Sequence, residues 1–363
     1  MIKILFVMNY IKNGGPSRVV LNIINNLDKS KYEVNILTLK DKNDNKIVEL
    51  LYNQNVNVIQ LNYSKNSSVI VNIHKIRRII KQLNIDIAHS HGLLPDIIIS
   101  KGKYKRIATL HSILEEDYID FYGKKYGQLL CKIHEKYLNK LDLVSCCSES
   151  VYNAMKKKIK KINFVRNGID FDYPEENKKI RNKLNIPLDA IVYIYSGRLV
   201  TRKRILQLLD LFNKYKKENE YLLVLGTGPL YDEVIKYDSE QIRILGFKSN
   251  IYDYYAISNV YVSNSFSEGF SISIIEALGC GLHLLISENV SHLECFNIDK
   301  NYYIGEHFCE NTFESKKEAL INRIKSQSNN SLKQFQREYL SGKSMTAKYM
   351  IFYEKLLNKQ SFK

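Results

Sequence analysis

Short apolar runs rich in β-branched residues alternate with helical patterns along this chain, and the alternation limits the folds that it can adopt. The run "IKILFV" (2–7) predicts a buried strand. The segment "SRVVLNIINNL" (17–27) predicts a helix, because its apolar residues recur three and four positions apart. Another strand is predicted at "YEVNILTL" (32–39). Strand, helix and strand in this order form a βαβ unit, so the pattern predicts a parallel sheet with helices on both faces.

The alternation continues to about residue 148 and starts again at residue 191. In the first part it predicts helices at 74–83 and 121–141 and strands at 85–91, 106–112 and 141–148. In the second part it predicts strands at 191–196, 221–226, 242–246, 259–265 and 282–287, and helices at 204–217, 229–237, 250–256 and 270–280. Residues 170–190 hold two of the five prolines and many charges, which is typical of a hinge-like connector.

These patterns predict an α/β protein with two doubly wound, Rossmann-like domains facing a cleft. A chain of 363 residues is long enough for two hydrophobic cores. We place the first domain at residues 1–170 and the second at residues 171–343. Sheets of this kind bind ligands beyond the carboxyl ends of their strands, so the residues that follow the strands are the first candidates for a site.

The positive charge of the chain is concentrated in its first half. Residues 1–165 hold 27 Lys and Arg against 14 Asp and Glu, whereas residues 166–363 hold 27 against 24. Runs such as "KKKIKK" (156–161) either form a solvated surface or attract nucleic acid, an anionic membrane surface or a phosphate-bearing substrate. The first apolar run is too short for a signal peptide or a membrane span, so we expect a cytoplasmic protein.

Several loops that contain glycine follow predicted strands in the second half. They are "SGRLVTRKR" (196–204), "GTGPL" (226–230), "GFKSN" (246–250) and "SFSEGFS" (265–271). Glycine lets a backbone approach a ligand closely, and helix N-termini point amides toward an anion.

Two cations in the first of these loops, Arg198 and Lys203, are poorly placed for the dipole of the helix that follows. They are well placed for a diphosphate, so we predict an anionic ligand. The alternative is that both are ordinary surface residues in a segment that also contains Arg202 and Arg204.

Two glutamates, Glu268 and Glu276, lie eight positions apart in "FSEGFSISIIEALGCG" (266–281). Glu268 precedes a predicted helix, where its role could be limited to an interaction with the helix dipole. Glu276 lies on an apolar helix, where a lone carboxylate is costly unless a donor bonds to it. A ribose diol would supply two such donors.

The motifs "NGGPSR", "NGID", "GRLVTRK", "GTGPL", "LGF" and "EGFSISIIE" together resemble the retaining family-4 glycosyltransferases of the GT-B fold. The resemblance covers nearly the whole chain, in the same order and spacing. It implies that Arg198 and Lys203 contact the diphosphate of a nucleotide-sugar donor and that Glu276 binds its ribose. It also implies that Glu268 faces the donor sugar.

The same resemblance implies further donor contacts at Gly14, Gly15, Gly197, Gly226, Gly228, Phe247, Gly269, Phe270 and Ser271. His111 matches a histidine near the anomeric centre of the transferred sugar, and we count it as catalytic with Arg198, Lys203 and Glu268. Residues 344–363 look like a terminal helix that crosses back to the first domain. His89 and His91 end a predicted strand and either line an acceptor pocket or have structural roles.

The chain departs from the family pattern at three places. Arg204 stands where the family often has glycine, and His283 stands where it has proline; we expect His283 to be a buried structural residue. The usual Gly-Gly pair is missing from "SENVSHLE" (287–294). The motif "DFD" (170–172) resembles a metal site, but it follows an Asn-Gly turn, so we predict turn and cap chemistry and no metal.

We therefore expect a retaining transferase that moves a sugar from a nucleotide sugar, with UDP as the expected nucleotide. The expected acceptor is a lipid-linked glycan in the synthesis of capsule, exopolysaccharide or O-antigen, and the basic first domain would suit the inner face of the cell membrane. We expect no cofactor. A nucleotide-sugar epimerase or a glycosyl phosphorylase on the same fold stays open. A nucleic-acid binder is suggested by charge alone and lacks a recognisable motif, so we expect no nucleic-acid partner.

Overall fold

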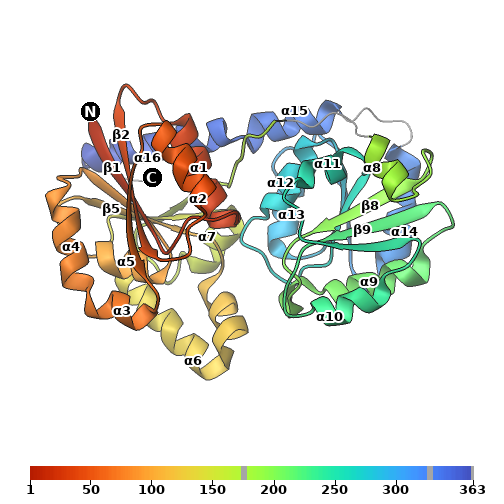
Figure 1. Cartoon of the computed structure of the whole chain (residues 1–363), viewed down its shortest axis with the longest axis horizontal. Helices are drawn as coiled ribbons and strands as arrows, with labels where there is room; N and C mark the ends of the chain where they lie inside the picture. The colour runs from red at the N-terminus through yellow and green to blue at the C-terminus, as the bar shows by residue number, and fades with distance from the viewer. Residues whose placement is uncertain (173–177, 325–329, 361–363) are drawn as a thin grey trace. The chain divides into compact units, whose positions relative to one another are not determined.

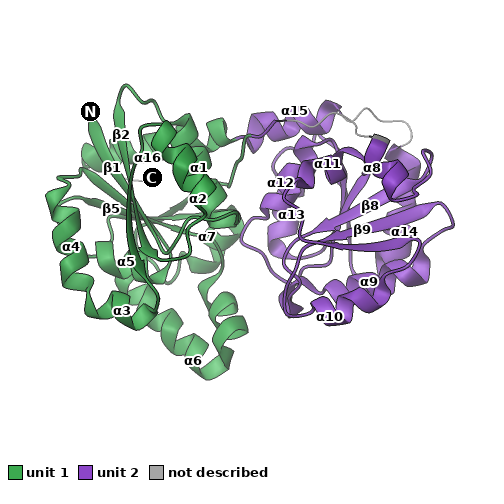
Figure 2. Cartoon of the chain, in the orientation of Figure 1, with its two compact units in different colours: residues 1–170, 342–363 green, residues 171–341 purple. Residues whose placement is uncertain are grey.

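The computed structural model describes residues 1–172, 178–324 and 330–360 (Figure 1). The chain divides into two compact units (Figure 2). Unit 1 consists of Met1–Asp170 and Gly342–Lys363, and unit 2 consists of Phe171–Ser341. The last segment of the chain therefore folds with the first.

Unit 1 is built on a parallel sheet that has, in the described residues, seven strands in the order β3-β2-β1-β4-β5-β6-β7. The strands are β1 (Ile2–Met8), β2 (Tyr32–Lys40), β3 (Asn57–Tyr63), β4 (Ile87–His91), β5 (Lys105–Leu110), β6 (Leu143–Cys146) and β7 (Ile162–Phe164). The central strand β1 is buried from Ile4 to Met8, because helices cover both faces of the sheet. The strand order reverses at β1, which pairs with β2 on one side and β4 on the other.

The helices of unit 1 are α1 (Gly15–Asn26), α2 (Asn45–Asn53), α3 (Asn66–Val71), α4 (Ile73–Gln82), α5 (Leu93–Ile99), α6 (Leu114–Leu138), α7 (Glu149–Met155) and α16 (Gly342–Leu357). Helix α16 packs beside α1. Asp170 joins the two, since its carboxylate accepts from the backbone N–H of Gly342 at 3.0 Å and from Nδ2 of Asn26 at 2.8 Å. The first residue of the "DFD" motif thus caps a helix.

Unit 2 repeats the same topology with, in the described residues, six parallel strands in the order β10-β9-β8-β11-β12-β13. The strands are β8 (Ile191–Ser196), β9 (Glu220–Leu225), β10 (Ile242–Gly246), β11 (Val260–Ser263), β12 (His283–Ser287) and β13 (Gly305–Phe308). The order reverses at β8, between β9 and β11. His283 is buried at the start of β12, as expected for a structural residue.

The helices of unit 2 are α8 (Lys178–Lys183), α9 (Ile205–Tyr215), α10 (Tyr231–Val234), α11 (Ile251–Ala256), α12 (Ile272–Gly279), α13 (Val290–Phe296), α14 (Phe313–Ile324) and α15 (Asn330–Tyr339). Three short 3₁₀ turns complete the unit: η1 (Thr201–Lys203), η2 (Ile235–Tyr237) and η3 (Glu310–Thr312). The prediction of two parallel-sheet α/β domains is confirmed. No helix in the described ranges is long and apolar enough to cross a membrane.

The segment predicted as a hinge-like connector is partly folded into unit 2. It contains α8, and the side chain of Arg181 is buried. The Arg181 guanidinium donates to the carbonyls of Leu188 at 2.8 Å and Ile257 at 3.0 Å. Residues 178–190 are therefore structural, whereas residues 173–177 lie outside the described part of the chain.

Candidate functional site

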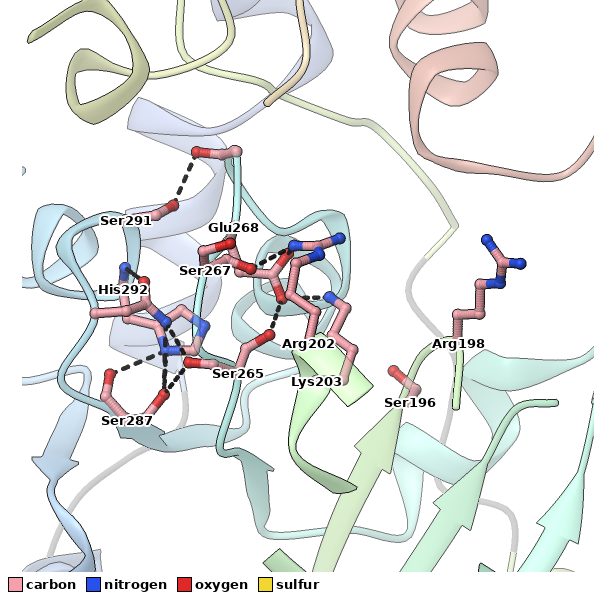
Figure 3. Close-up of polar contacts among 12 residues, drawn as sticks. Ser196, Arg198, Arg202, Lys203, Ser265, Ser267, Glu268, Ser287, Ser291 and His292 are labelled. Atoms are coloured by element: carbon pink, nitrogen blue, oxygen red, sulfur yellow. Dashed lines mark hydrogen bonds and ion pairs between the residues drawn. The ribbon is translucent and has the colours of Figure 1, made fainter. Parts of the chain in front are cut away.

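The candidate site of unit 2 lies beyond the carboxyl ends of β8 and β11, where the strand order of the sheet reverses (Figure 3). The loop after β8 runs through η1 to α9, and the loop after β11 leads to α12. Because β8 and β11 pair in parallel, both loops leave the same edge of the sheet. The backbone N–H of Phe266 donates to the carbonyl of Arg202 at 2.9 Å and joins the loops. Ligands bind at such reversal points in open α/β sheets.

The centre of this site is an ion pair between Lys203 and Glu268. The Lys203 ammonium donates to Oε1 of Glu268, which also accepts from Oγ of Ser265 at 2.7 Å. The Arg202 guanidinium lies 3.7 Å from Oε2 of Glu268 and donates to the carbonyl of Ser267. The side chains of Lys203 and Glu268 are only 17% and 8% exposed. Two cations and one carboxylate leave this cluster with a net positive charge, which favours an anionic ligand.

The protonation state of Glu268 follows from its surroundings. Burial alone would raise its pKa, but the positive charges of Lys203 and Arg202 outweigh burial and lower the pKa to about 2. Glu268 is therefore ionised at neutral pH. It can hold a cation or accept hydrogen bonds from a ligand, and it cannot donate a proton.

The loop that carries Glu268 is fixed by side chains at the end of β12 and just after it. Oγ of Ser287 and Nδ2 of Asn289 donate to the carbonyl of Ser265 at 2.7 and 2.8 Å. Oγ of Ser291 donates to the carbonyl of Gly269 at 2.8 Å. These residues belong to "SENVSHLE", the segment that lacks the Gly-Gly pair of the family. Polar side chains therefore position the loop in this chain.

His292 is a residue of this site that sequence reasoning missed. It is buried, and its Nδ1 lies 3.0 Å from the carbonyl oxygen of Ser287. Its Nε2 has no hydrogen-bond partner among the described residues. Burial lowers the pKa of His292 to about 4, so the ring is neutral at pH 7. Its position after β12, the strand beside β11, is the signal that could have identified it.

The two cations predicted to contact a diphosphate have different surroundings. Lys203 belongs to the Glu268 cluster, whereas Arg198 is exposed and its side chain points away from that cluster in Figure 3. Arg202, which sequence reasoning treated as a neighbour only, takes part in the cluster instead. Arg204 adopts a left-handed conformation at φ 48° and ψ 40°, with its guanidinium 4.7 Å from the ring centre of Phe266. This is the position where the family often has glycine, and its conformation explains that preference.

Glu276 is the fifth residue of α12, and it is only 2% exposed. Its Oε1 accepts a hydrogen bond from the hydroxyl of Tyr252 on α11 at 3.0 Å. The Tyr252 ring stacks on Phe171 with the ring centres 4.7 Å apart. A buried carboxylate needs such a donor, so Tyr252 accounts for part of the cost of placing Glu276 on an apolar helix. Tyr252 was not predicted, because one tyrosine among 26 gives no distinctive signal.

The glycines after β9 allow the loops of unit 2 to pack against one another. Gly226 has φ 143°, and a Cβ there would lie 1.8 Å from the carbonyl oxygen of Gly197. A Cβ at Gly228 would lie 2.3 Å from the carbonyl oxygen of Leu199. Both glycines are thus required by the backbone of the loop that carries Arg198, apart from any donor contact.

The remaining candidates of unit 2 surround the start of α12 and the end of β10. Ser271 is the N-cap residue of α12, and Phe270 before it is buried. The backbone carbonyl of Gly269 is held by Ser291. Phe247, after β10, is 62% exposed. Helix α12 begins at Ile272, so its first amides lie between Glu268 and Glu276 in the sequence. Contact of these amides with phosphate stays a prediction.

Unit 1 brings His91 and His111 together at the ends of β4 and β5. Nδ1 of His91 lies 2.9 Å from Nε2 of His111, and the rings stack 5.2 Å apart. Nε2 of His91 is buried without a partner among the described residues. Burial lowers the pKa of His111 to about 4, so both rings are neutral at pH 7. Gly14 is the N-cap residue of α1 and Gly15 is its first residue, and the space at Gly14 is open within 4 Å.

His89 has a structural position. It is fully buried in the core of unit 1, with Nδ1 2.8 Å from the hydroxyl of Tyr353 and Nε2 2.7 Å from Oγ1 of Thr109. Both ring nitrogens are engaged, so His89 does not line an acceptor pocket. Of the two readings of this residue, the structural one fits the contacts.

A metal centre would need several hard or soft ligands in one place. Within the described residues, no group of three or more His, Cys, Asp or Glu side chains could hold a metal ion. The positive charge beside Glu268 comes from Lys203 and Arg202.

Two curated proteins of Escherichia coli are similar to this chain. The O-antigen biosynthesis glycosyltransferase WclY is 28% identical over 312 residues, which cover 81% of this chain and 82% of WclY. The UDP-Gal:α-D-GlcNAc-diphosphoundecaprenol α-1,3-galactosyltransferase is 25% identical over 260 residues, or 63% of each chain.

Among solved structures, the Anabaena protein HepE in complex with UDP-glucose matches 98% of this chain and 100% of its own. The TM-score is 0.80 at 14% identity. This match shows that the chain has the fold of a known GT-B protein.

Two family models match successive parts of the chain. The model for Glycosyltransferase Family 4 matches residues 13–173, and the model for Glycosyl transferases group 1 matches residues 176–338. Together the two matches span nearly all of both units and include every residue of the Lys203–Glu268 cluster. The chain therefore belongs to the group 1 glycosyltransferases of the GT-B fold.

Proposed function

We propose that this enzyme moves a sugar from a nucleotide-sugar donor, UDP-linked, to a lipid-linked glycan, with retention of the anomeric configuration. The observation that carries the proposal is the Lys203–Glu268 cluster, a buried and net positive site at the strand-order reversal of unit 2. HepE has UDP-glucose bound, and one E. coli relative uses UDP-Gal and a diphosphoundecaprenol-linked acceptor. These names support UDP and a lipid carrier in this chain. The product would be a surface polysaccharide such as capsule, exopolysaccharide or O-antigen.

The residues of unit 2 supply the electrostatics of the transfer. When the bond between the anomeric carbon and the diphosphate breaks, negative charge builds on the diphosphate. Lys203 and the amides at the start of α12 stabilise that charge, and Arg198 adds a second cation. The ionised Glu268 accepts hydrogen bonds from sugar hydroxyls and keeps Lys203 in place. The Glu276 carboxylate accepts from the ribose.

The reaction needs no strong base in this proposal. The acceptor hydroxyl attacks the anomeric carbon on the face that the diphosphate leaves, and its proton passes to an oxygen of the leaving diphosphate. Neutral His111 donates a hydrogen bond to the transferred sugar. The proposal includes no metal and no cofactor, because protein cations and amides stabilise the diphosphate.

A screen of nucleotide sugars by thermal unfolding tests the donor assignment. A donor present at about 100 times its dissociation constant adds about 2.7 kcal/mol of stability. The proposal expects a UDP-sugar to protect the wild-type protein and to protect the variant Glu276→Ala much less. Equal protection of both proteins would contradict the site.

Analysis of the products separates the proposed transfer from its alternatives. An epimerase would change the nucleotide sugar without an acceptor, and a phosphorylase would form sugar 1-phosphate from phosphate and a glycoside. The proposal expects UDP and a lengthened lipid-linked glycan. Tight binding of DNA or RNA with a steep salt dependence would point to the nucleic-acid alternative.

A further inference from the structure

Helix α6 of unit 1 is a bent hairpin with a projecting tip. The sequence predicts one helix at 121–141, but Gly123 has φ 75° and ψ 166° and breaks α6 into two arms. Figure 1 shows the two arms, in yellow, meeting at a tip at the lower edge of unit 1. The six residues at the tip, 121–126, read "FYGKKY" and are all exposed.

A buried polar network braces the two arms and ties them to the sheet. The hydroxyl of Tyr118 on the first arm lies 2.7 Å from Nδ1 of His134 on the second. Nε2 of His134 lies 2.6 Å from Oδ2 of Asp96 on α5, and Asp96 accepts from Oγ of Ser90 on β4. A Cβ at Gly127 would lie 2.7 Å from the backbone of Tyr118, so the arms touch. The tip is thus held in a fixed position relative to the sheet of unit 1.

The exposed face of this hairpin is unusually apolar. Phe121, Tyr122, Tyr126, Leu129 and Ile133 are 57%, 54%, 68%, 56% and 37% exposed. They are five of the 16 large hydrophobic residues exposed in the described part of the chain. Tyr126, Leu129 and Ile133 recur at helical spacing on the second arm and form one stripe, whereas Phe121 and Tyr122 lie at the tip. A contiguous exposed stripe of this kind marks an interaction surface.

The charges on the second arm are mainly positive, whereas the first arm is acidic, with Glu115, Glu116, Asp117 and Asp120. Lys124, Lys125, Lys132 and Lys136 are exposed on the second arm. The acidic residue among them, Glu135, lies 3.4 Å from the ammonium of Lys158. The basic run 156–161 adjoins the base of this arm, because Asn139 bonds to the backbone of Lys158 and Lys160 at 3.0 Å.

We propose that the tip and second arm of α6 dock on an anionic lipid bilayer. Aromatic rings with polar edges favour the headgroup region, and lysines beside them favour anionic lipids. An acidic protein partner would match the lysines but would leave three aromatic rings at a rigid tip without an apolar layer to enter. Helix α6 begins three residues after His111, so docking would keep the acceptor side of unit 1 near the membrane. The biological role of this docking rests on the proposed lipid-linked acceptor, whereas the test of docking does not depend on that acceptor.

The test uses the full-length chain and vesicles of phosphatidylcholine with or without phosphatidylglycerol. We expect the protein to co-sediment with the anionic vesicles, and the binding to weaken as salt is raised. Lys124→Gln/Lys125→Gln should lower the partition coefficient by roughly 25-fold, because each lysine near an anionic surface contributes about a factor of five. Phe121→Ser/Tyr126→Ser should also release the protein. The control Lys46→Gln/Leu50→Ser, on exposed positions of α2, should bind as the wild type does.

A second readout reports insertion directly, because the chain has no tryptophan. Tyr126→Trp should give a blue shift of fluorescence on anionic vesicles, whereas Tyr52→Trp on α2 should not. Equal binding of all variants, a blue shift at Tyr52→Trp alone, or self-association through α6 without vesicle binding would overturn the inference. Protection by UDP-sugars in the absence of vesicles is measured separately, so a failure of the proposed function is distinguishable from a failure of docking.

Discussion

Glu268 connects the two loops that carry the candidate chemistry of unit 2. It lies 65 residues from Lys203 in the sequence, yet the pair is in direct contact and largely shielded from solvent. Shielding makes the interaction strong and makes either partner costly to remove alone. A loss of activity in a Lys203 or Glu268 variant therefore has to be separated from a loss of stability.

The stability that Glu268 contributes should depend on pH. Its pKa in the folded chain is lowered from 4.5 to about 2, so the contribution is present above about pH 4.5 and is lost as the pH falls toward 2. The shift corresponds to about 3 kcal/mol. We expect Glu268→Gln to be destabilised by about this amount at neutral pH and to approach the wild type in acid. Denaturant unfolding of unit 2 measures the difference in free energy of unfolding between the wild type and Glu268→Gln. Glu288→Gln, at an exposed site, is the control. If that difference stayed constant in acid, the prediction would be contradicted.

Glu276 should act on the nucleotide. A hydrogen bond to a charged group is worth about 1.5–3 kcal/mol, so Glu276→Ala should weaken binding of UDP roughly 10- to 100-fold. Tyr252→Phe keeps the carboxylate and removes its 3.0 Å donor, so it should weaken binding much less. Titration calorimetry with UDP measures both variants. If Tyr252→Phe cost as much as Glu276→Ala, the carboxylate would have a structural role only.

At the scale of elements, the start of α9 shows how this chain departs from its family. Arg204 has a positive φ, which disfavours every residue with a Cβ. We expect Arg204→Gly to be more stable than Arg204→Ala by about 1 kcal/mol, because both lose the contact with Phe266 and only glycine avoids the strain. Inside a helix, by contrast, an alanine variant is more stable than a glycine variant. Thermal unfolding of the two variants decides the matter, and an alanine variant as stable as the glycine variant would show that no strain is present.

Helix α16 should depend on Asp170. The Asp170 carboxylate bonds both to the first residue of α16 and to Asn26 on α1. Removing the cap in Asp170→Ala should cost about 1–2 kcal/mol and speed amide hydrogen exchange in α16. Asp172→Ala, two residues away at an exposed position, is the matched control. Unchanged exchange in α16 would mean that packing against α1 holds it without the cap.

Sequence periodicity predicted the central strands of both sheets better than the outer strands. The central strands β1 and β8 were predicted within a residue, because continuous apolar runs are typical of strands buried on both faces. The outer strands β3, β7 and β13 were not predicted. Strands β7 and β13 have only three and four residues, whereas β3 has seven but lies at a sheet edge and mixes polar with apolar residues. The break in α6 was missed because a glycine within a helical pattern is often tolerated.

At the scale of the whole molecule, the family motifs identified the loops, but the side-chain partners came only from the fold. Spacing singled out Lys203, Glu268 and Glu276. It could not reveal that Tyr252 and the serines after β12 bond to these segments, because such contacts join loops far apart in the sequence. It placed Arg198 and Lys203 on one diphosphate, but it did not show that Lys203 and Arg202 contact Glu268. Motifs therefore predict which loops form a site, and tertiary packing decides how their side chains pair.

The stereochemistry of sugar release tests the central claim most directly. The enzyme is incubated with an α-linked UDP-sugar in water without acceptor, and proton NMR records which anomer appears first. We expect the wild type to release the α anomer, and we expect the release to be roughly 100-fold slower or more in Lys203→Met, because a preorganised cation is lost from the leaving diphosphate. Early release of the β anomer, or an undiminished rate in folded Lys203→Met, would contradict the claim.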